Sequence, residues 1–186
     1  MKDQFKVTTR TIVAAGLGAA IFMLLFMYVK VPSWVPETQF QTAYGLSAFF
    51  GALFGPIAAF LVAFIGHALS DFLQYGSPWW SWVIASGVAS FVFGLAYKRT
   101  RVEEGTFGIK DILTFNLFQI IGNLLAWLVV APVLDIVIYA EPANKVFLQG
   151  AVACGMNIIS AGVIGTLLLV AYAATRTKKG SLSKGA

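Results

Sequence analysis

Residues 42–86 read TAYGLSAFFGALFGPIAAFLVAFIGHALSDFLQYGSPWWSWVIAS. Two apolar runs flank the Gly55-Pro56 pair. Because proline stops a helix, this stretch predicts an antiparallel helical hairpin with a tight turn. Its second half, residues 66–86, holds the chain's one histidine, His67, and a carboxylate one helical turn later, Asp71. Three of the five tryptophans follow in the same segment. A polar pair and a tryptophan cluster in so apolar a context indicate where to expect function.

The composition of the whole chain is typical of an integral membrane protein. Of the 186 residues, 59% are hydrophobic and only 11% are charged, and the mean hydropathy is +0.81. Soluble domains carry about 25% charged residues. At about 20 residues per spanning helix, the chain accommodates five or six spans and no separate soluble domain. Cys154 is the one cysteine, so no disulfide framework is expected, and its apolar surroundings indicate a packing role.

The apolar runs predict an all-α bundle of six transmembrane helices in a single domain, residues 1–186. The spans are expected at about 10–29, 42–54, 57–73, 79–97, 111–131 and 145–174. Pro32 and Pro36 place a loop after the first run, and Pro132 is expected to end the fifth. The first run is longer than the apolar core of a signal peptide, and no clear cleavage site follows, so we expect a retained span.

The basic residues predict that both termini are cytoplasmic. Six spans put the termini on one side of the membrane, together with the segment near residues 98–110. Eleven of the thirteen lysines and arginines fall on that side: Lys2, Lys6, Arg10, Lys98, Arg99, Arg101, Lys110, Arg176, Lys178, Lys179 and Lys184. Lys30 and Lys145 fall on the other side. Because lysine and arginine accumulate in cytoplasmic loops, the net charge of +5 reflects topology and does not indicate nucleic acid.

His67 and Asp71 are spaced to share one helix face. Ionisable residues within a span usually face the protein interior or a water-filled cavity. Three interpretations stay open: a structural pair, part of a ligand pocket, and a metal site or catalytic acid–base pair. The third lacks support, because the chain has no further histidine and no cysteine pair to complete a metal site.

The aromatic and amide side chains allow structural and binding roles alike. Trp79 and Trp80 suit an interfacial aromatic belt or a surface on which a planar heteroaromatic ligand stacks. Amides in lipid spans usually form hydrogen bonds between helices. Asn123, Trp127 and Gln149 lie at a depth that suits a pocket open to the outside. Two deeper amides, Asn116 and Asn157, are interpreted as structural.

Small residues recur at spacing four on the first apolar run. Ala15 and Ala19 form one such pair, and Gly16 and Ala20 form another. Small residues let another helix backbone approach closely in lipid. The spacing fits packing within this chain as well as docking on a partner.

Five segments of the chain resemble one family of transport proteins. They are residues 63–71 (AFIGHALSD), 78–84 (PWWSWVI), 131–135 (APVLD), 139–144 (YAEPAN) and 164–168 (IGTLL). Together they resemble the substrate-binding S components of energy-coupling factor (ECF) transporters. Within that family the chain is most similar to an uncharacterised group near the riboflavin-type S components, and the similarity covers essentially the whole chain.

The resemblance implies a six-helix protein of the bacterial cytoplasmic membrane that captures a vitamin or precursor from outside. It implies as partners a membrane scaffold (T) subunit and two cytoplasmic ATPases, which supply the energy, so the chain itself is not expected to be an enzyme or to hold a cofactor or metal. Helix 1 would dock on the scaffold through Ala15 and Ala19, or through Gly16 and Ala20. The pocket would involve the loop after helix 1, the helix 3–4 region, the helix 5–6 loop and the outer ends of helices 4–6. The candidate binding residues there are Trp34, His67, Asp71, Trp79, Trp80, Asn123, Trp127, Tyr139, Glu141 and Gln149.

The resemblance leaves the ligand open. A mouth rich in tryptophan and poor in charge favours a small heteroaromatic ring, so hydroxymethylpyrimidine or pyridoxine is the expected ligand, with cobalamin, thiamine and riboflavin as alternatives. Two functions of other classes stay open as well. An intramembrane enzyme would use His67 and Asp71, and a membrane scaffold protein would bind no ligand.

Overall fold

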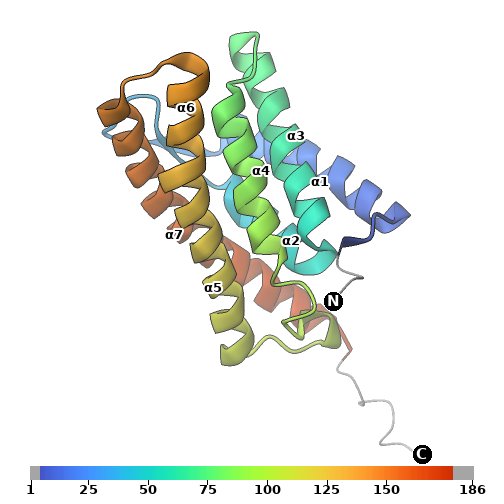
Figure 1. The fold of residues 1–186 in the computed structure, drawn as a ribbon. Coiled ribbons are helices and arrows are strands. Elements are labelled where there is room, and N and C mark those ends of the chain that lie inside the picture. Colours follow the sequence, from blue (N-terminus) through green and yellow to red (C-terminus); the bar gives the residue numbers. More distant parts are fainter. Residues whose placement is uncertain (1–4, 178–186) are drawn as a thin grey trace, which may run out of the picture.

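A computed structural model describes residues 5–177 of the chain. Within that range the structure is helical apart from one short hairpin (Figure 1). The helices are α1 (Thr9–Tyr28), α2 (Ala43–Phe54), α3 (Pro56–Tyr75), α4 (Trp80–Gly94), α5 (Ile109–Leu125), α6 (Ala131–Tyr139) and α7 (Ala143–Thr175). Strands β1 (Lys30–Pro32) and β2 (Gln39–Gln41) pair antiparallel. This hairpin lies in the segment expected to be an irregular loop.

Helices α2 and α3 occupy the two apolar runs on either side of Gly55. Gly55 has a φ of 90°, a conformation that side-chain-bearing residues rarely adopt, and Pro56 is the first residue of α3. The turn is therefore as short as the sequence predicts. Helix α3 packs against α1 on one side and α4 on the other, and α2 lies between these helices and α7.

The fifth apolar run does not end at Pro132, and the sequence-based prediction was wrong here. The helix continues from Ile109 to Tyr139 as α5, a π-helical turn over Ala126–Val130, and α6 (Figure 1). In the π-helical turn the Ala131 N–H donates to the Ala126 carbonyl, five residues back. Proline has no N–H and its ring clashes in a regular helix, and the wider turn just before Pro132 accommodates both effects. Asp135 therefore lies on a helix and not in a loop.

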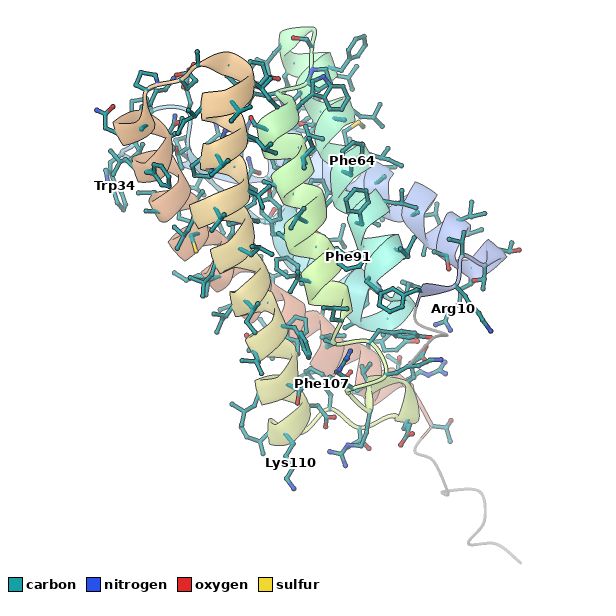
Figure 2. The ribbon with its side chains drawn as sticks, viewed as in Figure 1. Arg10, Trp34, Phe64, Phe91, Phe107 and Lys110 are labelled. Atoms are coloured by element: carbon teal, nitrogen blue, oxygen red, sulfur yellow. The ribbon has the colours of Figure 1, made fainter. Side chains whose placement is uncertain are left out.

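The chain's connections fall at two opposite ends of the bundle. At one end Arg10 of α1 forms an ion pair with Glu103, with Nη2 and Oε1 2.6 Å apart, and α7 ends nearby (Figure 1). Asp111 stabilises this end by accepting hydrogen bonds from the Arg101 guanidinium (2.8 Å) and the Gly108 N–H (3.1 Å). The β-hairpin and the α3–α4 and α6–α7 connections lie at the other end. In Figure 2, Trp34 marks that end, far from Lys110 and Arg10.

The helices differ in their ability to cross a membrane. Among the described residues, four helical segments are long and apolar enough: α1, α3, the continuous α5–α6 segment of 31 residues, and α7 with 33. Helices α2 and α4 are apolar but have only 12 and 15 residues. Four of the basic residues used for the topology, Lys2, Lys178, Lys179 and Lys184, lie outside the described residues.

Candidate functional site

A cavity of about 580 Å³ lies at the hairpin end of the bundle, between the hairpin and helices α1, α2, α3, α4, α6 and α7. It is large enough for a ligand the size of a vitamin. The residues that line it are Phe26, Lys30, Glu37, Thr38, Gln39, Gln41, Tyr44, His67, Asp71, Tyr75, Ser77, Trp79, Trp82, Trp127, Asp135, Glu141, Lys145, Gln149, Ala153 and Asn157. Six of the ten predicted binding residues are among them: His67, Asp71, Trp79, Trp127, Glu141 and Gln149.

Aromatic rings form a continuous wall of the cavity. Trp127 stacks on Trp82, with ring centroids 5.5 Å apart, and meets the edge of Tyr44 at 5.3 Å. Phe26 packs on the His67 imidazole at 4.2 Å. Offset and edge-to-face contacts of this kind fix the rings in place. The wall therefore offers rigid flat surfaces on which a planar ring can stack.

Asp135 is a buried carboxylate that holds three donors. Its Oδ1 accepts from the Trp79 indole N–H (2.6 Å) and from the Ser81 hydroxyl, and its Oδ2 accepts from the Trp82 indole N–H (2.7 Å). The residue is only 2% exposed. The donors come from the start of α4 and the carboxylate from α6, so Asp135 sets the positions of two of the aromatic rings. Asp135 is not among the ten residues predicted from the sequence to bind the ligand.

His67 is linked to Tyr44 through Ser86, and Asp71 lies beside the His67 ring. Asp71 Oδ1 lies 3.4 Å from His67 Nε2, and Oδ2 accepts from the Trp79 backbone N–H at 3.0 Å. His67 Nδ1 and the Tyr44 hydroxyl each lie 2.7 Å from Ser86 Oγ, which itself donates to a backbone carbonyl. Ser86 Oγ therefore connects the His67 ring with the Tyr44 hydroxyl. The pair is thus held by the bundle while it also lines the cavity.

One face of α7 runs from the mouth of the cavity to its floor. Lys145, Gln149, Ala153 and Asn157 all line the cavity at a spacing of four residues. Twelve residues of helix rise about 18 Å, so the stripe spans the depth of the site. Asn157 was interpreted from the sequence as structural, and the structure instead makes it part of the cavity wall. The four-residue spacing is the signal that could have identified it.

The hairpin is fastened over the mouth by contacts with α7. Lys145 Nζ lies 3.2 Å from Glu37 and 3.0 Å from Glu141, and Gln149 Nε2 donates to the Pro36 carbonyl at 3.1 Å. On the other side of the mouth, Lys30 Nζ donates to Gln74 at 3.0 Å. Burial lowers the pKa of the Lys30 ammonium, and the Asp71 carboxylate opposes that shift. These contacts hold the hairpin against both sides of the mouth.

Trp34 and Trp80, two predicted binding residues, lie outside the lining. Trp34 sits in the turn of the hairpin (Figure 2) and is 81% exposed. The neighbouring Val35 is buried. Trp80 packs on the outer Phe64 ring at 6.1 Å. Two residues along a helix rotate by about 200°, so Trp82 faces the cavity where Trp80 cannot. Trp82 belongs to the tryptophan cluster of residues 66–86 but is not among the ten predicted binding residues.

Asn123 and Tyr139, the other two, support the lining from behind. Asn123 accepts from the Trp127 indole N–H at 2.9 Å and donates to Gln119 at 3.0 Å. Tyr139 packs on the Trp79 ring at 4.4 Å, and its hydroxyl accepts the Trp80 backbone N–H at 3.0 Å. Both contacts orient cavity tryptophans, so these residues act on the site through their neighbours.

The two small-residue pairs of α1 differ in their exposure. Ala15 and Ala19 are buried against the rest of the chain, at 5% and 2% exposure. Gly16 and Ala20 are exposed on the outer surface, and no atom lies within 4 Å of the position that a Cβ of Gly16 would take. In this structure only the second pair is accessible to another helix.

The site combines stacking surfaces with hydrogen-bond acceptors. Within residues 5–177, no three side chains of His, Cys, Asp or Glu come close enough together to hold a metal ion. What the cavity can do is enclose a planar molecule and bind its polar groups.

Comparison with known proteins agrees with this geometry. Residues 6–174 match the family described as ECF-type riboflavin transporter, S component. The chain belongs to this family. It is 52% identical over 184 residues, 99% of each chain, to a UPF0397 protein of Lacticaseibacillus casei (strain BL23). It is 55% identical over 179 residues, 96% of this chain and 98% of the relative, to a UPF0397 protein of Exiguobacterium sp. (strain ATCC BAA-1283 / AT1b). The resemblance stated from the sequence is confirmed.

Membership assigns the general role of the chain. S components are the substrate-binding subunits of ECF transporters, in which the ATPase activity belongs to partner subunits. This S component is therefore a transport subunit, and its apolar helices are consistent with a membrane protein.

Proposed function

We propose that this S component captures a small planar heteroaromatic vitamin, or a precursor of one, from outside the cell. The observation that carries the proposal is the cavity itself, in which tryptophan, tyrosine and phenylalanine rings surround the buried carboxylates Asp71 and Asp135. Flat apolar surfaces with a few fixed polar groups are typical of sites for ring-shaped ligands. The substrate would bind there unchanged and leave by transport.

The expected ligand is hydroxymethylpyrimidine or pyridoxine. Both are compact rings with amino or hydroxyl groups, and a cavity of about 580 Å³ encloses a molecule of that size. Riboflavin, which appears in the family description, and thiamine are the first alternatives. Cobalamin is far larger and would have to bind mostly through the mouth.

The topology belongs to the same proposal. Six spans, with α2 and α4 as the short ones, form a single transmembrane domain of a multi-pass protein in the bacterial cytoplasmic membrane. The cavity then opens outward. The end that carries Arg10, Arg101 and Lys110 faces the cytoplasm, in keeping with the preference of basic residues for that side.

The partners would be a membrane scaffold (T) subunit and two cytoplasmic ATPases. Gly16 and Ala20 are the docking pair on α1 that we favour, because their exposure leaves room for a partner helix. The alternative pair, Ala15 and Ala19, is covered by this chain's own helices.

A fluorescence titration tests the proposal. Trp79, Trp82 and Trp127 line the cavity, so the purified protein should show saturable quenching with one member of a panel of hydroxymethylpyrimidine, pyridoxine, thiamine, riboflavin and cobalamin, at sub-micromolar concentration. In the control variant Trp34→Phe, the quenching should persist because this ring lies outside the cavity. No response from folded protein across the panel would contradict vitamin capture and favour a scaffold. Chemical conversion of a panel member would indicate an enzyme.

A further inference from the structure

The charged side chains that line the cavity are divided unequally between its mouth and its interior. The mouth carries two lysines and two glutamates, whose formal charges cancel: Lys30, Lys145, Glu37 and Glu141. The interior carries two carboxylates, Asp71 and Asp135, on residues that are 4% and 2% exposed. Two formal negative charges of the cavity wall are therefore buried without a lysine or arginine beside them in the lining.

Neither buried carboxylate forms an ion pair with a lysine or arginine of residues 5–177. Asp135 accepts from two indole N–H groups and one hydroxyl, which are all neutral donors. Asp71 accepts from a backbone N–H and lies 3.4 Å from His67 Nε2, and a protonated His67 would match only this one charge. Buried charges are normally paired, because a lone charge loses the solvation that water provides. At least one charge of the interior is thus left for a ligand to match.

Aromatic faces surround the same space. Trp82, Trp127 and Tyr44 form the packed wall, and the rings of Trp79 and Phe26 line the cavity as well. The face of an aromatic ring is the negative end of its quadrupole, and it attracts cations, most strongly in tryptophan. The rings and the carboxylates therefore favour the same kind of ligand, one that is flat and positively charged.

An unpaired amide in the lining independently indicates a polar ligand. Asn157 is only 2% exposed and lines the cavity, and no residue of the described part of the chain forms a hydrogen bond with its side chain. Its Oδ1 is sealed inside the wall, so the NH₂ group is the part that can face the cavity. Polar groups in protein interiors are normally paired, so an acceptor on a bound ligand would complete this donor.

We infer that the cavity selects a heteroaromatic ring that carries a positive charge. The inference rests on the proposed function and specifies the class of substrate. The attraction to Asp71 and Asp135 acts over several ångströms in the protein interior, so it needs no contact with carboxylate oxygens that already hold protein donors. The rings of hydroxymethylpyrimidine and pyridoxine meet the requirement when a ring nitrogen is protonated. A phosphate ester of either compound would be repelled.

Titration with a matched pair of compounds tests the inference. Thiamine has a permanent positive charge on its thiazolium ring, and its deaza analogue, in which carbon replaces the charged nitrogen, has nearly the same shape and a neutral ring. By isothermal titration calorimetry, the wild type should bind thiamine with a Kd at least about tenfold lower than that of the analogue. Because the two shapes match, the ratio of the two Kd values reports charge and cancels effects on packing.

Two charge variants should move this ratio in opposite directions, which misfolding cannot do. Asp71→Asn keeps an oxygen for the Trp79 backbone N–H but removes a negative charge, and it should reduce the preference for thiamine by about threefold or more. Lys30→Met removes a positive charge from the lining and should increase the preference by about twofold. Glu103→Gln, at the opposite end of the bundle, is the control and should leave the ratio unchanged.

A proton measurement covers the case in which hydroxymethylpyrimidine or pyridoxine binds and thiamine does not. At about pH 8, where these compounds carry no net positive charge, binding should take up about one proton, measured by titration in buffers of different ionisation enthalpy. Binding without proton uptake would overturn the inference and leave the proposed function standing. So would equal affinity for thiamine and its analogue, a ratio that Asp71→Asn does not change, or a preference for riboflavin. Folded protein that binds no member of the vitamin panel would contradict the proposed function, and the inference with it.

Discussion

The substitution Asp135→Asn should destabilise the protein strongly although it preserves the shape of the side chain. The carboxylate accepts from the Trp79 indole and the Ser81 hydroxyl on one oxygen and from the Trp82 indole on the other. An amide offers only one oxygen, so at least one buried donor then faces an NH₂ group. Because the shapes match, the effect isolates hydrogen bonding from packing.

The size of the effect follows from the bonds that change. One hydrogen bond to a charged acceptor is lost, which costs about 1.5–3 kcal/mol. The bonds that remain lose their charge assistance, which roughly halves their strength. We therefore expect the free energy of unfolding to fall by about 3 kcal/mol.

Unfolding of the detergent-solubilised protein, followed by tryptophan fluorescence, provides the assay. The control is Glu103→Gln, which removes the half-exposed ion pair with Arg10 and should cost less than about 1 kcal/mol. A loss below about 0.5 kcal/mol for Asp135→Asn, no larger than an ordinary surface substitution, would refute the idea that this carboxylate holds the tryptophans of the cavity in place.

Three further predictions concern packing, docking and the hairpin. Gly150→Ala should lower the free energy of unfolding by about 1–3 kcal/mol, because a Cβ there would lie 2.1 Å from a backbone oxygen of the π-helical turn. Gly16→Ala is the control, because the space around Gly16 is open. Equal unfolding curves for the two variants would contradict the close approach of α7 to the π-helical turn. Gly16→Leu or Ala20→Leu should abolish uptake of the ligand by cells that carry the energising subunits, while ligand binding persists. Ala15→Leu should instead reduce the yield of folded protein. Ligand uptake that survives both Gly16→Leu and Ala20→Leu would exclude this docking face. Lys145→Met should speed ligand dissociation in stopped-flow fluorescence by about threefold, the effect of losing an exposed ion pair, and an unchanged rate would show that this pair does not hold the hairpin.

The apolar runs and their breaks could be predicted from the sequence because each depends on local chemistry. The short turn at Gly55 follows from a glycine in a left-handed conformation next to a proline at the start of a helix. The same rule failed at Pro132. A π-helical turn removes the clash that normally ends a helix, and Pro132 follows Ala131, with no glycine to turn the chain.

The polar residues of the site were harder to predict, because their roles depend on which helix faces which. His67 and Asp71 could be placed on one face by their spacing. The sequence could not indicate that Asp135, 64 positions beyond Asp71, returns to the same site. Asn157 was predicted to be structural because it lies deep along α7, and the sequence does not show how far the cavity extends into the bundle.

The tryptophans show how rotation about a helix decides a role. Trp79 and Trp82 line the cavity, whereas Trp80 packs on the outer surface. Trp79 precedes the helix and bridges Asp71 and Asp135 through its backbone and indole N–H groups. Helix ends are the least certain part of a sequence-based prediction, so the sequence alone does not determine which of these rings turns inward.

The most direct test of the capture role is native mass spectrometry of the purified protein after incubation with a small-molecule extract of the growth medium. The account predicts one adduct of 1:1 stoichiometry, identified on release as a heteroaromatic compound with amino or hydroxyl groups. The adduct should be kept by Trp34→Phe, because the altered ring lies outside the cavity. Folded wild-type protein that takes up no compound would contradict the account.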